Sequence, residues 1–114
     1  MVIRQGEVYW INLPEPKKSE PGFRRPCVVV QNDTFNRSRI KTTIICILTT
    51  NLRLSNAPGN VLLTQGEANL PKESVVNISQ ILTVNKTDLF PENKIGQLSA
   101  LKIDLIVSGL RTIF

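Results

Sequence analysis

Histidine is absent from all 114 residues of the sequence. Histidine is the usual acid and base at neutral pH and the commonest metal ligand. Its absence therefore excludes Ser-His-Asp and Cys-His catalytic sites, and it excludes zinc hydrolases that depend on histidine ligands. Any reaction must use carboxylates, hydroxyls, thiols, lysine or arginine, and we expect neither a metal nor a cofactor.

Cysteines, aromatic residues and long apolar runs are also scarce. Cys27 and Cys46 both lie inside apolar runs, which predicts buried thiols rather than a disulfide or a metal site. No run approaches the roughly 18 apolar residues of a membrane span, and the first seven residues turn polar too early for a signal peptide. We therefore expect a soluble, cytoplasmic protein that does not contact membranes.

The residues that are present describe one small basic domain. A chain of 114 residues is long enough for a single domain, spanning residues 1–114, to bury its own core. The net charge is +5, and nine of the 14 lysines and arginines occur in the first 53 positions. This distribution favours a polyanionic partner such as nucleic acid.

The hydrophobic pattern predicts several short strands followed by a helix. Strands are expected at residues 7–13, 26–31, 42–50, 60–64 and 74–84, with an irregularity in the last one near Gln80 and Ile81. Apolar residues recur at helical spacing near the end of the chain, where Ser99 is a suitable N-cap. Short strands without long intervening helices predict a mainly β fold, a small antiparallel barrel with a C-terminal helix.

Two stretches hold the side chains best suited to chemistry. Arg24 and Arg25 lie where a polar loop meets the strand expected to begin at Pro26, and a guanidinium matches the geometry of phosphate oxygens. Thr49 and Thr50 end the most apolar strand and should face opposite ways. Taken singly, an arginine pair is more often solvated and a strand threonine is more often structural.

Other side chains could contact a nucleic acid. Ser79 and Gln80 could bind base edges, or they could form the solvent face of a strand. Phe23 is the better candidate for stacking on an unpaired base, and we assign Tyr9 and Trp10 to the core.

Several blocks together resemble the MazF/PemK family of toxins. The N-terminal blocks are residues 4–13 and the stretch Gly22-Phe-Arg-Arg-Pro-Cys-Val-Val-Val-Gln-Asn-Asp33. The strand ending at Thr49, the block at residues 74–86 and the closing Ser108-Gly-Leu110 also match. The resemblance implies a single-domain, SH3-like barrel shared with MazF, PemK and CcdB. It also implies a homodimeric, metal-independent endoribonuclease that cuts single-stranded RNA at short motifs.

The resemblance also implies roles for individual residues. Arg25 and Thr49 would be catalytic, although a one-residue difference in the loop at residues 38–41 leaves Thr50 as the alternative. The expected RNA-binding residues are Phe23, Arg24, Glu20, Thr50, Asn51, Ser79 and Gln80. A cognate, MazE-like antitoxin would cover the RNA groove.

The implied reaction suits a chain without histidine. In RNA the 2′-OH can attack its own phosphodiester, which gives a 2′,3′-cyclic phosphate and a 5′-OH. The enzyme then needs alignment and charge stabilisation more than a nucleophile of its own. Arginine is a poor base because its pKa exceeds about 12, and Glu20 is the nearest loop carboxylate for that role. The alternative is a non-catalytic barrel that binds nucleic acid or a protein such as gyrase.

Overall fold

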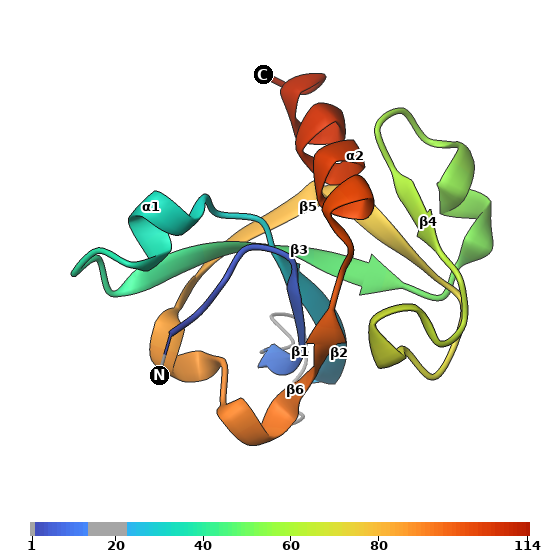
Figure 1. Cartoon of the computed structure of the whole chain (residues 1–114). Helices are drawn as coiled ribbons and strands as arrows, with labels where there is room; N and C mark the ends of the chain where they lie inside the picture. Colours follow the sequence, from blue (N-terminus) through green and yellow to red (C-terminus); the bar gives the residue numbers. More distant parts are fainter. Residues whose placement is uncertain (1, 14–22) are drawn as a thin grey trace.

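Six antiparallel strands form one curled sheet in the order β4-β5-β3-β2-β1-β6 (Figure 1). The computed structural model describes residues 2–13 and 23–114. The strands are β1 (Glu7–Leu13), β2 (Phe23–Val29), β3 (Thr42–Thr49), β4 (Val61–Leu63), β5 (Ser74–Asn85) and β6 (Lys94–Gln97). The helices are α1 (Asp33–Asn36), α2 (Ala100–Arg111) and four single-turn 3₁₀ segments, η1 (Leu52–Asn56), η2 (Glu67–Asn69), η3 (Lys86–Asp88) and η4 (Pro91–Asn93).

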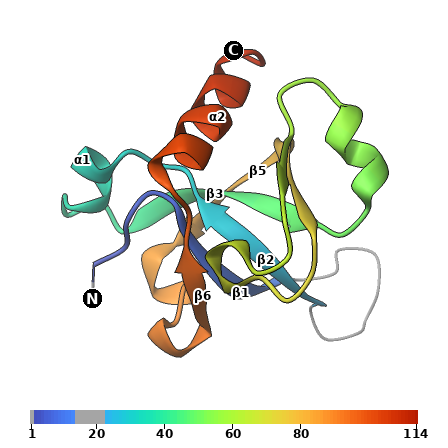
Figure 2. The same ribbon diagram turned by 45° about the vertical axis from the view of Figure 1, so that its right-hand side comes forward.

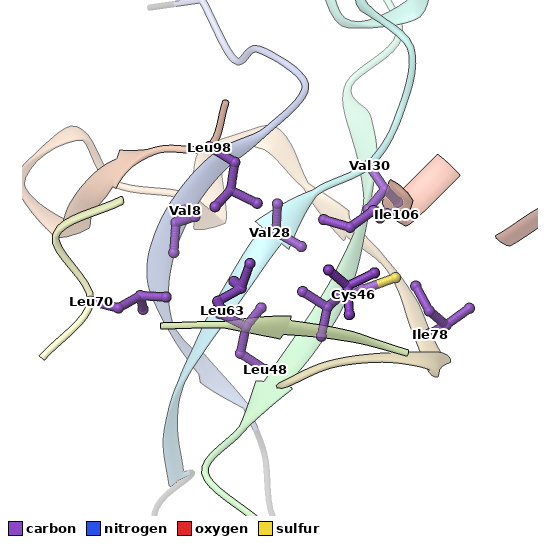
Figure 3. Packing of buried hydrophobic residues seen from close by; sticks show 12 residues of the cluster. Val8, Val28, Val30, Cys46, Leu48, Leu63, Leu70, Ile78, Leu98 and Ile106 are labelled. Atoms are coloured by element: carbon purple, nitrogen blue, oxygen red, sulfur yellow. The ribbon is translucent and has the colours of Figure 1, made fainter. Parts of the chain in front are cut away.

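The paired segments of β2 and β3 are apolar because both of their faces are buried. Successive side chains of a strand point to opposite faces. In β3, Cys46 and Leu48 join one hydrophobic cluster, whereas Ile45 and Ile47 join another on the opposite face. The first cluster also receives residues from β1, β2, β4, β5 and α2, as Figure 3 shows. The sheet thus lies between two cores and forms a rigid frame for the loops at its ends.

The curled sheet closes without a continuous strand ladder. The η2 turn, which connects β4 to β5, packs against the opposite edge strand β6 (Figure 2). The side-chain amide of Asn69 donates a hydrogen bond of 3.1 Å to the carbonyl of Ile95. A Cβ on Gly96 would lie 2.3 Å from the carbonyl oxygen of Ala68, so only glycine permits this approach. Two backbones therefore meet at the seam of the barrel.

Helix α2 covers one end of the barrel. Its N-cap is Ser99, whose hydroxyl accepts a hydrogen bond of 3.3 Å from the backbone N–H of Lys102. The helix buries Ile106 in the first cluster and Gly109 against the turn before β4. No helix in the described part of the chain is both long and apolar enough to span a bilayer.

The mainly β fold with a C-terminal helix, predicted from the sequence, is confirmed. The register of β3 on β5 shifts so that Cys46 pairs with Ile81 and Leu48 with Val76. This confirms the predicted irregularity. Neither β6 nor α1 was predicted from the sequence.

The predicted start of the second strand was wrong. β2 begins at Phe23 rather than at Pro26, so both arginines lie within the strand. Pro26 pairs with Trp10 of β1, and the pairing of β2 with β3 begins only at Cys27. A proline is tolerated here because β3 does not pair with this residue.

Candidate catalytic cleft between strands β2 and β3

The β2 and β3 strands separate at one end of the sheet and leave an open cleft. Their ladder covers only Cys27–Val29 against residues 45–47. Residues 23–26 pair with β1 alone, while the end of β3 pairs with β5 alone. The resulting cleft has a volume of about 460 Å³. It is lined by Trp10, Arg24, Arg25, Pro26, Leu48, Thr49, Thr50, Asn51, Leu70, Pro71, Lys72 and Ser74.

Arg25 and Thr49 lie on the same face of the sheet. Residues two apart in a strand point to the same face. Arg25 therefore shares a face with Cys27 of β2, and Thr49 shares a face with Ile47 of β3. Cys27 and Ile47 both belong to the second cluster. The guanidinium carbon of Arg25 lies 5.2 Å from the ring centroid of Phe23, a cation–π contact that steadies it. The two strands thus direct a guanidinium and a hydroxyl to one side of the cleft.

The Thr49 hydroxyl is oriented by the turn that follows β3. Its oxygen accepts a hydrogen bond of 3.2 Å from the backbone N–H of Asn51. This contact uses a lone pair and leaves the hydroxyl hydrogen available to a ligand in the cleft. Thr50 lies beyond the strand and is exposed, so its hydroxyl is less firmly positioned.

Arg24 occupies the other face of β2 together with Trp10. Its guanidinium carbon lies 5.2 Å from the indole centroid, and it donates a hydrogen bond of 3.4 Å to the side chain of Asn93. The prediction that Trp10 belongs to the core was wrong, whereas Tyr9 is buried as expected. Trp10 points to the opposite face of β1 from Tyr9. It pairs with Pro26, just beyond the end of the β2–β3 ladder, and its ring lines the cleft.

The cleft carries positive charge only. Arg24, Arg25 and Lys72 line it, and among the described residues no carboxylate does. The ion pairs of residues 2–13 and 23–114 join Lys94 to Glu7 and Lys102 to Glu67, so they neutralise none of these cations. Such a site favours a negatively charged ligand. Lys72 comes from the turn before β5, and its place in the cleft depends on the β4–β5 pairing, which the sequence does not reveal.

Comparison with known proteins identifies the chain. Residues 4–114 match the family model of the "PemK-like, MazF-like toxin of type II toxin-antitoxin system". This chain belongs to the MazF/PemK toxin family. It is 42% identical to "Endoribonuclease MazF6" of Mycobacterium tuberculosis over 113 residues, which cover 99% of this chain and 97% of that relative. It is 35% identical to "Endoribonuclease MazF" of Staphylococcus epidermidis over 77% of this chain and 72% of that protein.

Solved structures share the fold of this MazF-family toxin. A mycobacterial endoribonuclease in complex with its cognate antitoxin aligns with a TM-score of 0.77 and 24% identity, over 96% of this chain and 92% of that one. The MazE–MazF structure from Deinococcus radiodurans also aligns with a TM-score of 0.77, at 17% identity over 99% and 96% of the two chains. The predicted MazF/PemK barrel is therefore confirmed.

The remaining predicted site residues of this toxin lie elsewhere. The structure brings Arg24, Arg25, Thr49, Thr50 and Asn51 together in the cleft, with Phe23 against Arg25. Ser79 and Gln80 are exposed in the irregular part of β5 and do not line the cleft, which β5 reaches only at its first residue, Ser74. They belong to a polar network in which the Ser79 hydroxyl and the Asn77 side chain form a hydrogen bond of 3.3 Å. Glu20 lies outside the described residues.

Both cysteines of the toxin are buried, as predicted. Burial raises the pKa of the Cys27 and Cys46 thiols to about 12. Burial also raises the pKa of the Tyr9 hydroxyl well above its ordinary value, helped by the charge of Glu7 and by a hydrogen bond of 3.0 Å to that carboxylate. These groups stay protonated at neutral pH, and a buried, protonated thiol is not a nucleophile.

Proposed function

We propose that this chain is an endoribonuclease toxin that cleaves single-stranded RNA in the β2–β3 cleft. The observation that carries the proposal is the placement of Arg25 and Thr49 on one face of a cleft whose described charges are all positive. Its relatives named endoribonucleases are similar over nearly the whole chain, which supports the same activity. The phosphodiester would enter the cleft as the anionic ligand.

The RNA itself would supply the nucleophile. The 2′-OH loses its proton and its oxygen forms a bond to phosphorus, while the bond from phosphorus to the 5′ oxygen breaks and that oxygen gains a proton. The products are a 2′,3′-cyclic phosphate and a 5′-OH. The Arg25 guanidinium would bind the non-bridging oxygens as negative charge develops, and Thr49 would donate a hydrogen bond to one of them. The general base would come from outside this pair, with Glu20 as the candidate.

The other cleft residues would hold the RNA strand. Trp10 and Phe23 offer ring faces on which unpaired bases can stack, and a guanidinium lies against each ring. Arg24, Thr50 and Asn51 offer donors and acceptors to phosphates and base edges. Ser79 and Gln80 would contact only RNA that extends beyond the cleft.

We also propose a homodimer and an antitoxin partner. Leu101 and Leu105 on α2 are 68% and 46% exposed, and a second copy of the chain would cover them. Two of the similar solved structures are toxins in complex with an antitoxin, which supports an antitoxin that covers the RNA cleft. A toxin that cleaves mRNA would act in the cytoplasm.

Cleavage of long single-stranded RNA in EDTA tests this proposal. Wild type is expected to cleave, and Arg25→Ala and Thr49→Val are expected to reduce the rate by about 10²–10³-fold, the usual cost of losing a donor to transition-state charge. Arg111→Ala and Thr83→Val are the matched controls, since both residues are exposed and lie outside the cleft. A Thr50→Val variant distinguishes the two threonines and is expected to retain most activity.

Each failure has a distinct meaning. If wild type binds RNA but cleaves none across diverse sequences, the chain is a non-catalytic barrel and the nuclease proposal is rejected. If EDTA abolishes cleavage, the metal-independent mechanism is wrong. If Thr50→Val loses activity and Thr49→Val does not, the catalytic hydroxyl belongs to Thr50.

A further inference from the structure

A second cationic cleft lies at the opposite end of strand β3. We call it the α1 cleft, because α1 and the loop after it form one wall. Its volume is about 1030 Å³. The N-terminal segment, the α1–β3 loop and the end of β5 meet here, on the side of the sheet where β3 begins (Figure 1). It is lined by Val2, Arg4, Asp33, Asn36, Arg37, Ser38, Arg39, Ile40, Lys41, Asn85, Lys86 and Thr87.

Positive charge dominates this cleft and is not neutralised by the described residues. Five of its lining side chains are lysine or arginine and only Asp33 is acidic. One oxygen of Asp33 already accepts hydrogen bonds from the backbone N–H of Gln5, at 2.7 Å, and from the side chain of Asn36, at 3.2 Å. The ion pairs of residues 2–13 and 23–114 include none of the five cations. Like charges gathered without partners repel one another unless an anion joins them.

The loop that carries these cations is held in place. The ammonium of Lys86 donates hydrogen bonds to the carbonyls of Asn36, at 2.8 Å, and Ser38, at 3.2 Å. Asn36 is buried, and its side chain accepts a hydrogen bond of 2.8 Å from the Thr43 hydroxyl. The backbone beneath Arg37 and Arg39 is thus fixed, while both side chains are exposed. A fixed loop with exposed guanidinium groups can bind phosphate at little further cost in backbone order.

We propose that the α1 cleft binds backbone phosphates of the same RNA strand, outside the segment that is cleaved. This inference rests on the proposed function. Guanidinium forks match phosphate oxygens, and contacts of this kind add affinity without reading sequence. β3 joins the two clefts, and its eight residues span about 26 Å at roughly 3.3 Å per residue. Only an RNA long enough to cover that distance can occupy both clefts, so the toxin should favour long strands over short ones.

The test compares the binding of a short and a long strand. The probe is 2′-O-methyl RNA of mixed sequence, which lacks the nucleophile and stays intact, at about 4 nucleotides, too short to reach both clefts, and at about 40 nucleotides. Arg39→Glu is compared with Arg111→Glu, because both residues are exposed and each substitution changes the net charge equally. Arg39→Glu should weaken binding of the long strand about tenfold and should affect the short strand by less than about twofold, as expected for one lost phosphate contact outside the cleavage site.

The salt dependence supplies a second readout. For the long strand, the slope of log K against log salt should become shallower by about 0.7 in Arg39→Glu, the contribution of one phosphate contact with a single strand. The Arg111→Glu variant should keep the wild-type slope. Lys41→Glu should repeat the Arg39→Glu result. If circular dichroism shows that Arg39→Glu is unfolded, the Lys41→Glu variant tests the inference in its place.

Three results would overturn the inference. Long-strand affinity equal to that of Arg111→Glu would show that the cleft does not contact RNA. Equal losses on the short and long strands would place Arg39 in the cleavage site itself. Unchanged RNA affinity with a loss of binding to poly-glutamate would assign the cleft to an acidic protein. The failure of the proposed function is separate, because it appears as the absence of cleavage of any RNA by wild type.

Discussion

At the scale of single residues, the shape of the Arg25 guanidinium matters as much as its charge. A guanidinium donates two parallel hydrogen bonds to phosphate oxygens, whereas an ammonium is a compact charge on a flexible chain. Arg25 also packs on Phe23 at 5.2 Å, a contact that a lysine would weaken. The transition state should therefore distinguish the two side chains.

We predict that Arg25→Lys lowers the single-turnover cleavage rate by about 10²-fold, the loss expected for a misplaced donor to transition-state charge. Arg24→Lys is the matched comparison and should lower the rate far less, because Arg24 lies on the other face of β2, against Trp10. Rates measured at saturating RNA separate this effect from weaker binding. Equal losses in both variants would contradict a specific role for Arg25.

The buried thiols give a prediction about pH. In the folded chain, burial raises the pKa of Cys27 and Cys46 to about 12, whereas the unfolded chain ionises them near their ordinary value of about 9. Their stabilising effect is therefore complete below about pH 9 and is lost as the pH rises from there toward about 12. The thermal midpoint should fall over this range, and less steeply in Cys46→Ala. At pH 8 both thiols should react with a thiol reagent only after unfolding, and rapid native-state reaction would contradict their burial.

At the scale of elements, helix α2 is placed by a close approach between two backbones. A Cβ on Gly109 would lie 2.2 Å from the carbonyl oxygen of Gly59, in the turn before β4. We predict that Gly109→Ala lowers the free energy of unfolding by about 1–3 kcal/mol, because neither backbone can move aside without disturbing the core. Ser108→Ala, on the exposed side of the same helix, should change stability by less than about 0.5 kcal/mol. Urea unfolding curves measure both, and equal stabilities would contradict this packing.

Elements with a strong hydrophobic period could be predicted from the sequence, and weakly apolar ones could not. β3 and β5 carry β-branched runs, and α2 combines helical spacing with the Ser99 cap. β6 has the sequence Lys-Ile-Gly-Gln and four residues, which is too short for a period. It is a strand because it pairs with β1, and that pairing is a tertiary interaction.

The composition of the cleft was predictable only in part, for the same reason. Arg25 and Thr49 end or adjoin recognisable strands and belong to a family pattern, so their proximity could be expected. Trp10 was assigned to the core because aromatic residues in a strand usually pack inside. Its place in the cleft depends on where β3 stops pairing with β2, and a residue pattern in one strand does not specify the end of a ladder.

At the scale of the whole molecule, the excess charge of +5 is concentrated where strands end. The sheet holds one cationic cleft at each end of β3, and two hydrophobic clusters keep that strand rigid. A single-stranded polyanion is the ligand that such an arrangement can bind at both places. The fold thus supplies alignment and charge, and the RNA supplies the nucleophile.

The most direct test of this account is the chemistry of the RNA ends produced by the wild-type protein in EDTA. We predict a 2′,3′-cyclic phosphate and a 5′-OH at the cleaved bond, and no cleavage when the nucleotide before that bond carries a 2′-deoxyribose. Both results follow from attack by the substrate's own 2′-OH in the cleft of Arg25 and Thr49. Products with a 5′-phosphate, or cleavage of the 2′-deoxy substrate at an undiminished rate, would contradict it.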